Sequence, residues 1–188
     1  MTTLNALVKG SLSQIAKETG RTLAESWINV DAVILVDISL SMTECDARGG
    51  KSRYDVAQEE LTELQNSLPG KIAIVAFSEK QYFVPTGSLP QPMSTTDLAA
   101  ALKYVRVADS IPGMRFILIS DGEPNDEDAA LTEGRKFKNR IDCIYVGPES
   151  GKRSREFLQK LASLRNGEMQ LKPQLKELAA SIHGLLGA

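Results

Sequence analysis

Four short, largely apolar runs, rich in β-branched residues, recur along the chain. They cover residues 30–36, 72–77, 115–119 and 141–146. Largely apolar runs of this length are typical of parallel strands that are buried on both faces of a sheet. A fifth, shorter run at 82–84 follows the second across only four residues, which is too short for a helical crossover. The pattern therefore predicts a mostly parallel sheet with one antiparallel strand at its edge.

Helical periodicity fills the intervals between these runs. Apolar residues recur at three- and four-residue steps within 54–68, 98–105 and 157–164, and a closing helix at 175–185 is predicted just after Pro173. Strands and helices thus alternate, which favours a doubly wound, Rossmann-like α/β fold with helices on both faces of the central sheet. In such folds ligands bind beyond the carboxyl ends of the strands.

The residues before the first strand carry an apolar stripe of their own, from Leu12 to Trp27 at helical spacing. We expect residues 1–29 to form a leader helix packed on the domain, with a docking helix for a partner as the alternative. Residues 30–188 would then form the domain itself. A chain of 188 residues with 42% hydrophobic and 24% charged composition is ordinary for one globular domain with a sizeable core.

Polar clusters follow three of the predicted strands or lead into the next helix. They are Asp37-Ile38-Ser39-Leu40-Ser41, Thr96, and Ser120-Asp121-Gly122. In an extended strand the first and last residues of the first cluster would lie about 13 Å apart. A small ion could not bridge that distance, so this cluster predicts a loop in which oxygen atoms converge on a hard cation.

Each cluster also has a purely structural interpretation. Asp37 and Ser39 could satisfy backbone groups at a strand end, Thr96 could cap the following helix, and Asp121-Gly122 could be a turn. Asn125 is expected to cap the helix after it. The coincidence of three clusters at one edge of one sheet favours the metal-site interpretation.

Together these motifs resemble the metal-ion-dependent adhesion site of the von Willebrand factor type A (VWA) domain family, over roughly residues 30–186. The resemblance implies that Ser39, Ser41 and Thr96 are direct metal ligands. It implies that Asp37 and Asp121 bind the ion directly or through water. Mg²⁺ is the expected ion, and Mn²⁺ and Ca²⁺ share its preference for oxygen ligands.

The same resemblance implies a partner, because sites of this family capture acidic residues of other proteins and intracellular relatives serve in assemblies that include AAA-type ATPases. We therefore expect a metal-dependent protein-interaction module whose partner presents an Asp or Glu. Leu40 departs from the glycine that the family often has between the two serines.

A metal-dependent phosphoryl-transfer enzyme is the first alternative. Ser39 stands where the Asp-x-Asp motif of haloacid-dehalogenase-like phosphatases has its second carboxylate, and the chain has no Gly-x-x-x-x-Gly-Lys-Ser/Thr loop. We therefore expect no enzymatic activity. A scaffold domain that binds its partner without metal is the second alternative.

Charge and hydropathy limit the expected binding partners and cellular location. The formal net charge of −2, with no strongly basic block, lacks the electrostatic footprint of nucleic-acid binding. No segment approaches the roughly 20 apolar residues of a membrane span, and the N-terminal residues contain no apolar run of signal-peptide length. With two cysteines, Cys45 and Cys143, expected to be reduced thiols, the sequence predicts a cytoplasmic protein.

Overall fold

The computed structural model describes residues 7–46, 50–93, 95–147 and 150–171. Its centre is a six-stranded sheet with the strand order β3-β2-β1-β4-β5-β6. The strands are β1 (Ala32–Asp37), β2 (Ile72–Phe77), β3 (Gln81–Phe83), β4 (Arg115–Ser120), β5 (Ile141–Tyr145) and β6 (Met169–Leu171). All neighbouring pairs are parallel except β2 and β3, which form an antiparallel hairpin. The expected fold class, including its antiparallel edge strand, is confirmed.

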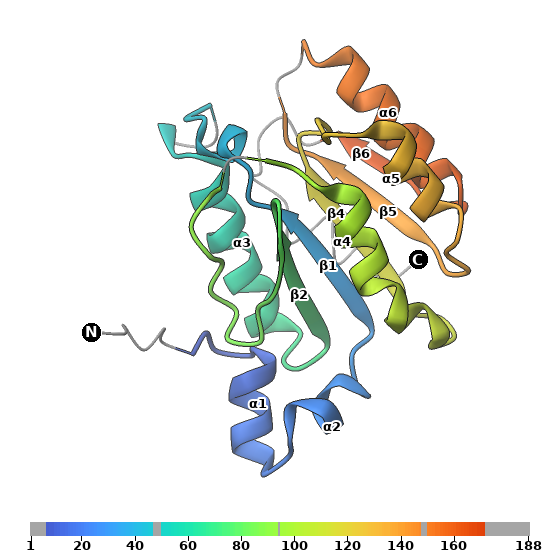
Figure 1. Ribbon diagram of the computed structural model, residues 1–188. Coiled ribbons are helices and arrows are strands. Elements are labelled where there is room, and N and C mark those ends of the chain that lie inside the picture. Colours follow the sequence, from blue (N-terminus) through green and yellow to red (C-terminus); the bar gives the residue numbers. More distant parts are fainter. Residues whose placement is uncertain (1–6, 47–49, 94, 148–149, 172–188) are drawn as a thin grey trace.

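Helices cover both faces of this sheet (Figure 1). Helix α3 (Arg53–Ser67) packs its apolar residues on one face, against alternate residues of the strands such as Ile34 and Ile74. Helices α4 (Leu98–Val105), α5 (Glu127–Gly134) and α6 (Lys152–Ser163) pack on the other face, against residues such as Leu35 and Leu118. Strands β1, β2 and β5 are buried along their whole length, which explains why their sequences are largely apolar.

The edge strand β6 was not predicted, because its three residues are too few to show a periodic pattern. The closing helix expected at 175–185 lies outside the described residues.

The leader forms two helices where one was expected. Helix α1 (Leu12–Thr19) ends at Gly20, whose φ of 66° is left-handed and whose amide donates to the carbonyl of Ala16. A glycine in this conformation is a common helix stop. Helix α2 (Leu23–Trp27) then begins with a capping box between Thr22 and Glu25.

The second of these helices contacts the edge of the sheet. The Trp27 ring meets the Phe83 ring edge to face, with centroids 5.1 Å apart and an interplanar angle of 74°. The leader backbone also bonds the segment after β3, since the amide of Ser13 donates to the carbonyl of Pro85 at 2.8 Å.

Within the described residues, no helix is both long enough and apolar enough to cross a membrane. The carboxyl ends of β1 and β4 lie next to each other in the sheet, toward the top of Figure 1. There β1 passes into a 3-10 turn, η1 (Leu40–Thr43), before the chain enters α3. This edge of the sheet carries the predicted site.

Candidate metal centre

Asp37 is the last residue of β1 and has no exposed surface. Its Oδ1 accepts a hydrogen bond from the amide of Ser39 at 2.8 Å, and its Oδ2 accepts one from the hydroxyl of Ser120 at 2.8 Å. Ser120 ends β4 and lies beside Asp37 because Val36 pairs with Ile119 in the parallel register. The carboxylate therefore satisfies local backbone, as its structural interpretation required, and also joins the two central strands.

The two serines of the first loop face each other. Beyond Asp37 the chain leaves the strand, and the amide of Met42 donates to the carbonyl of Ser39 at 3.1 Å in the turn η1. This curl brings the Oγ atoms of Ser39 and Ser41 to 2.9 Å from each other. Adjacent ligand oxygens of an octahedral Mg²⁺ ion, each at about 2.1 Å from the metal, lie about 3 Å apart. The hydroxyl pair thus has the spacing of two neighbouring ligands of such an ion.

Asp121 follows β4 directly and is 3% exposed. Its Oδ2 lies 3.8 Å from Nη1 of Arg53, a side chain that is itself buried at the start of α3. Arg53 is held by Asp46, whose two carboxylate oxygens accept from Nε (2.7 Å) and Nη2. Its Nη1 also lies 3.4 Å from the carbonyl oxygen of Ser41. One guanidinium thus links both halves of the predicted site.

The two buried aspartates oppose each other electrostatically. Burial, and after it the negative charge of Asp121, raises the pKa of Asp37 from 3.8 to about 7. The hydrogen bonds from Ser120 and Ser39 act in the opposite direction. A divalent cation beside both carboxylates would remove this conflict, so the donor set fits such an ion.

The structural interpretation of Thr96 was that it caps the following helix, but Thr96 does not cap α4. The cap is Asp97, whose Oδ1 accepts from the amide of Ala100 at 2.9 Å. Thr96 is instead tied to the loop after β4 by two reciprocal bonds. Its amide donates to Oδ1 of Asn125 at 3.2 Å, and the amide of Asn125 donates to its carbonyl at 2.9 Å.

The segment that carries Thr96 also runs beside the first loop. Met93 forms an isolated parallel bridge with Ser39, and its amide donates to the carbonyl of Ile38 at 2.7 Å. These backbone contacts bring all three clusters to one edge. Within the described residues, however, no hydrogen bond joins the Thr96 hydroxyl to the other four predicted ligands.

One expectation about the second loop was wrong. The N-cap of α5 is Asp126, which accepts from the amide of Ala129 at 2.9 Å, and not Asn125. Oδ1 of Asn125 instead accepts the hydrogen bond from the amide of Thr96, so Asn125 holds two loops together.

The sequence interpretation placed Ser120 in the third cluster without giving it a role, and it missed Arg53. Ser120 could have been found from strand register, since a parallel pair that aligns residues 36 and 119 places 37 beside 120. Arg53 carried a weaker signal. A cation in the first turn of a helix opposes the helix dipole, which indicates that its charge is needed elsewhere.

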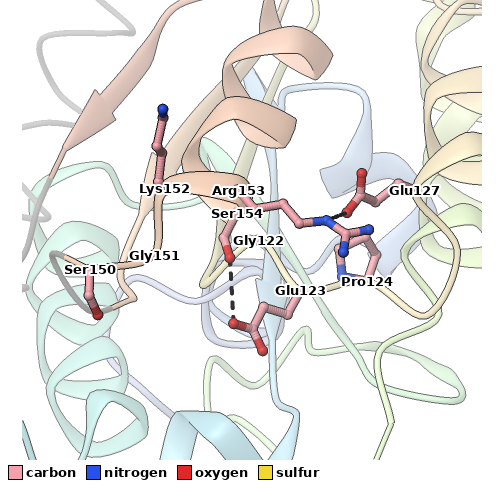
Figure 2. A pocket seen from close by; sticks show the side chains of 9 residues that line it. All are labelled: Gly122, Glu123, Pro124, Glu127, Ser150, Gly151, Lys152, Arg153 and Ser154. Carbon is pink, nitrogen blue, oxygen red and sulfur yellow. Dashed lines mark hydrogen bonds and ion pairs between the residues drawn. The ribbon is translucent and has the colours of Figure 1, made fainter.

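A cavity of about 460 Å³ adjoins this site beyond Gly122 (Figure 2). It lies between the loop after β4 and the start of α6. Nε of Arg153 donates to Glu127 at 2.9 Å, and the hydroxyl of Ser154 lies 3.5 Å from Oε1 of Glu123. The charged lining residues are two acidic, Glu123 and Glu127, and two basic, Lys152 and Arg153. The cavity is therefore polar but balanced in charge.

The donor set is selective in its chemistry. Among the residues that the structure describes, no group of three or more His, Cys, Asp and Glu side chains gathers as a metal cluster. The candidate centre depends on hydroxyls together with two carboxylates. Oxygen donors of this kind suit hard cations such as Mg²⁺, Mn²⁺ and Ca²⁺ better than zinc or copper.

Comparison with known proteins adds evidence about the fold. No protein-family model and no curated protein sequence matches the chain. Solved structures do match. A mutant of the PilB minor pilin from Streptococcus sanguinis is 13% identical, with a TM-score of 0.64 over 85% of this chain and 61% of that one. A von Willebrand factor type A protein from Catenulispora acidiphila is 19% identical, with a TM-score of 0.58 over 82% of this chain and 41% of that one.

The manganese-loaded TRAP protein from Plasmodium vivax is also similar. It is 19% identical, with a TM-score of 0.59 over 84% of this chain and 73% of that one. This chain therefore spans about three fifths of the pilin and two fifths of the Catenulispora protein. Identities this low establish a shared fold only, and that fold is the VWA fold expected from the motifs.

Proposed function

We propose that this chain is a protein-interaction module that holds a divalent cation at the carboxyl ends of β1 and β4 and uses it to bind an acidic residue of a partner. Ser39, Ser41 and Thr96 would hold the ion directly, and Asp37 and Asp121 directly or through water. The observation that carries the proposal is the pair of buried, mutually repelling aspartates beside two hydroxyls 2.9 Å apart.

Mg²⁺ is the proposed ion, with Mn²⁺ and Ca²⁺ as alternatives. All the donors are oxygens, which these three ions share as preferred ligands. The similar Plasmodium vivax structure was loaded with manganese, which supports Mn²⁺ as an experimental probe. When bound, such an ion supplies a coordination position that an external carboxylate can fill.

Charge explains why a carboxylate is the proposed partner group. Two aspartates can balance the double positive charge of the ion but cannot exceed it. They balance it less completely where a water molecule lies between carboxylate and ion. The positive charge of Arg53 is already engaged by Asp46. An anionic oxygen would therefore gain more at this ion than a neutral ligand would.

Binding is favoured over phosphoryl transfer because of the group at position 39. An Asp-x-Asp phosphatase needs a second carboxylate there as an acid, whereas Ser39 supplies a hydroxyl that faces Ser41. A metal-independent scaffold remains the competing interpretation, and metal titration separates it from the proposal. The AAA-type ATPase assemblies implied by the family resemblance are candidate partners, and the cytoplasmic location stays a prediction of the sequence.

The first test is calorimetric titration of Mg²⁺ and Mn²⁺ into metal-stripped protein. We expect one saturable site in the wild type and its loss in Asp37→Asn. The matched control is Asp126→Asn, the same substitution at the same edge of the sheet, where asparagine is an equally good helix cap. Equal metal binding by the wild type and Asp37→Asn would contradict the proposed site.

A second measurement addresses the acidic partner. Mn²⁺ is paramagnetic, so the relaxation of water protons reports exchangeable water on the bound ion. We expect a glutamate-containing peptide to reduce this relaxation, and the matched glutamine peptide to leave it unchanged. A response to both peptides, or to neither, would argue against carboxylate capture.

A further inference from the structure

Leu40 is a large apolar side chain that is exposed to solvent in the loop after β1. Its neighbours two residues away, Ile38 and Met42, are completely buried, whereas Leu40 is 53% exposed. It belongs to neither of the two core clusters of the described residues. Packing therefore does not explain why a large apolar side chain stands at this position.

The loop holds Leu40 in a fixed place. The hydroxyl of Thr43 donates to the carbonyl of Leu40 at 2.7 Å, and the amide of Glu44 donates to the carbonyl of Ser41 at 3.2 Å. These bonds close the turn η1 at the leucine and directly after it. A side chain on such a turn is presented to solvent at little further cost in backbone entropy.

The burial of the proposed ligands shows where a partner must approach. Asp37, Ser39, Thr96 and Asp121 are all buried, and Ser41 alone among the five is half-buried. The open side of the site is therefore the side of Ser41, next to Leu40.

Distance makes contact with Leu40 hard to avoid. The Cα atom of Leu40 lies about 3.8 Å from the Cα atoms of both Ser39 and Ser41. An incoming carboxylate oxygen on an octahedral ion would lie within about 4 Å of the hydroxyls of those serines. The chain that delivers this carboxylate would thus pass within reach of the leucine side chain.

We infer that Leu40 is a specificity-determining residue, and that the partner segment carries an apolar side chain within two residues of its metal-binding Asp or Glu. This inference rests on the proposed function and adds the kind of sequence that the site selects. The carboxylate would bind the ion, and the apolar side chain would cover Leu40. Acidic segments flanked only by polar residues would leave the leucine exposed and bind more weakly.

Synthetic peptides test this preference without a known partner. Each peptide has one central glutamate, flanked either by serine and glycine only or by a leucine placed one or two residues away. Binding is followed by fluorescence anisotropy at Mn²⁺ concentrations that saturate each protein variant. For the wild type we expect the best leucine-containing peptide to bind about five- to tenfold more tightly than the polar one.

Variants assign the preference to one side chain. Leu40→Ala should lose this advantage, and Leu40→Met, which keeps a long apolar side chain, should retain it. Val107→Ala removes another exposed apolar residue, 76% exposed in η3 (Arg106–Ser110), and should keep the full preference. Persistence of the preference in Leu40→Ala, or its loss in Arg153→Gln at the neighbouring cavity but not in Leu40→Ala, would overturn the inference.

The two proposals fail in different ways. Glutamate peptides that bind in a metal-dependent manner, with no gain from leucine, would overturn only the role of Leu40. Peptides that bind Asp37→Asn as well as they bind the wild type, with or without Mn²⁺, would overturn the metal-dependent function itself.

Discussion

Replacing Asp37 by asparagine should stabilise the metal-free protein at neutral and alkaline pH. The carboxyl group is fully buried, and burial together with the charge of Asp121 raises its pKa from 3.8 to about 7. The folded state therefore holds this proton more tightly than the unfolded state does. Above pH 3.8 the unfolded chain ionises first, so stability falls as the pH rises toward 7 and then stays constant.

The magnitude follows from the difference between the two pKa values. At about 1.4 kcal/mol per pH unit, the cost of ionising Asp37 in the folded protein reaches about 4 kcal/mol at pH 8. Asparagine has nearly the same shape and carries no charge. Its Oδ1 can accept from the amide of Ser39, as the carboxylate does at 2.8 Å, and its Nδ2 can donate to the hydroxyl of Ser120. We therefore expect a gain of about 2–4 kcal/mol at pH 8.

Urea unfolding at about pH 5 and about pH 8, with a chelator present, measures this gain. The difference between Asp37→Asn and the wild type should be large at the higher pH and narrow at the lower one. Mg²⁺ at about a thousandfold excess over Kd should offset this difference or reverse it, because only the wild type gains free energy from binding, about 4.1 kcal/mol at that concentration. A variant less stable than the wild type at pH 8 without metal would refute this reasoning.

Three further predictions concern other parts of the fold. Gly122→Ala should lower the free energy of unfolding by about 1–3 kcal/mol, because φ at Gly122 is +74° and a new Cβ would lie 2.6 Å from a backbone oxygen of α6. Thermal unfolding measures this loss, and an unchanged Tm would contradict the close approach. Cys45 is exposed and Cys143 is buried with a raised pKa, so iodoacetamide should label only Cys45 in the native protein, and rapid labelling of both would be inconsistent with this burial. Arg53→Met should destabilise the metal-free protein by about 2 kcal/mol in urea unfolding at neutral pH, since Asp121 loses the cation 3.8 Å away; equal urea midpoints would argue against that role.

The central fold could be predicted because its strands are uniform in burial. β1, β2 and β5 are buried at every position, so their largely apolar composition marks them, although the buried Asp142 in β5 interrupts it. The features that were missed depend on single residues or very short elements. Gly20 divides the leader into two helices through its left-handed φ of 66°, and the three residues of β6 gain their conformation from pairing with β5. Such elements are set by tertiary contacts and leave little periodic signal.

The candidate site was likewise predicted in part. Residue type and spacing were enough to predict that Asp37, Ser39 and Ser41 lie in one curled loop. The structure shows this curl, since the Oγ atoms of Ser39 and Ser41 lie 2.9 Å apart. The supporting contacts of Arg53 and Ser120 were not predicted, because they join elements that only the folded sheet brings together. Whether the five residues bind metal remains a proposal for the titration to test.

The arrangement of this edge makes sense as a compromise between stability and binding. Two buried carboxylates destabilise a metal-free fold, and sites that bind ligands commonly carry such local costs. Here the cost is offset in part by bonds from Ser120 and Ser39 to Asp37 and by Arg53 beside Asp121. The fold could then persist without an ion while keeping a strong electrostatic demand for one. A protein built in this way would couple its stability to metal concentration, so loss of the pH dependence in Mg²⁺ would connect the folding measurement directly to the proposed function.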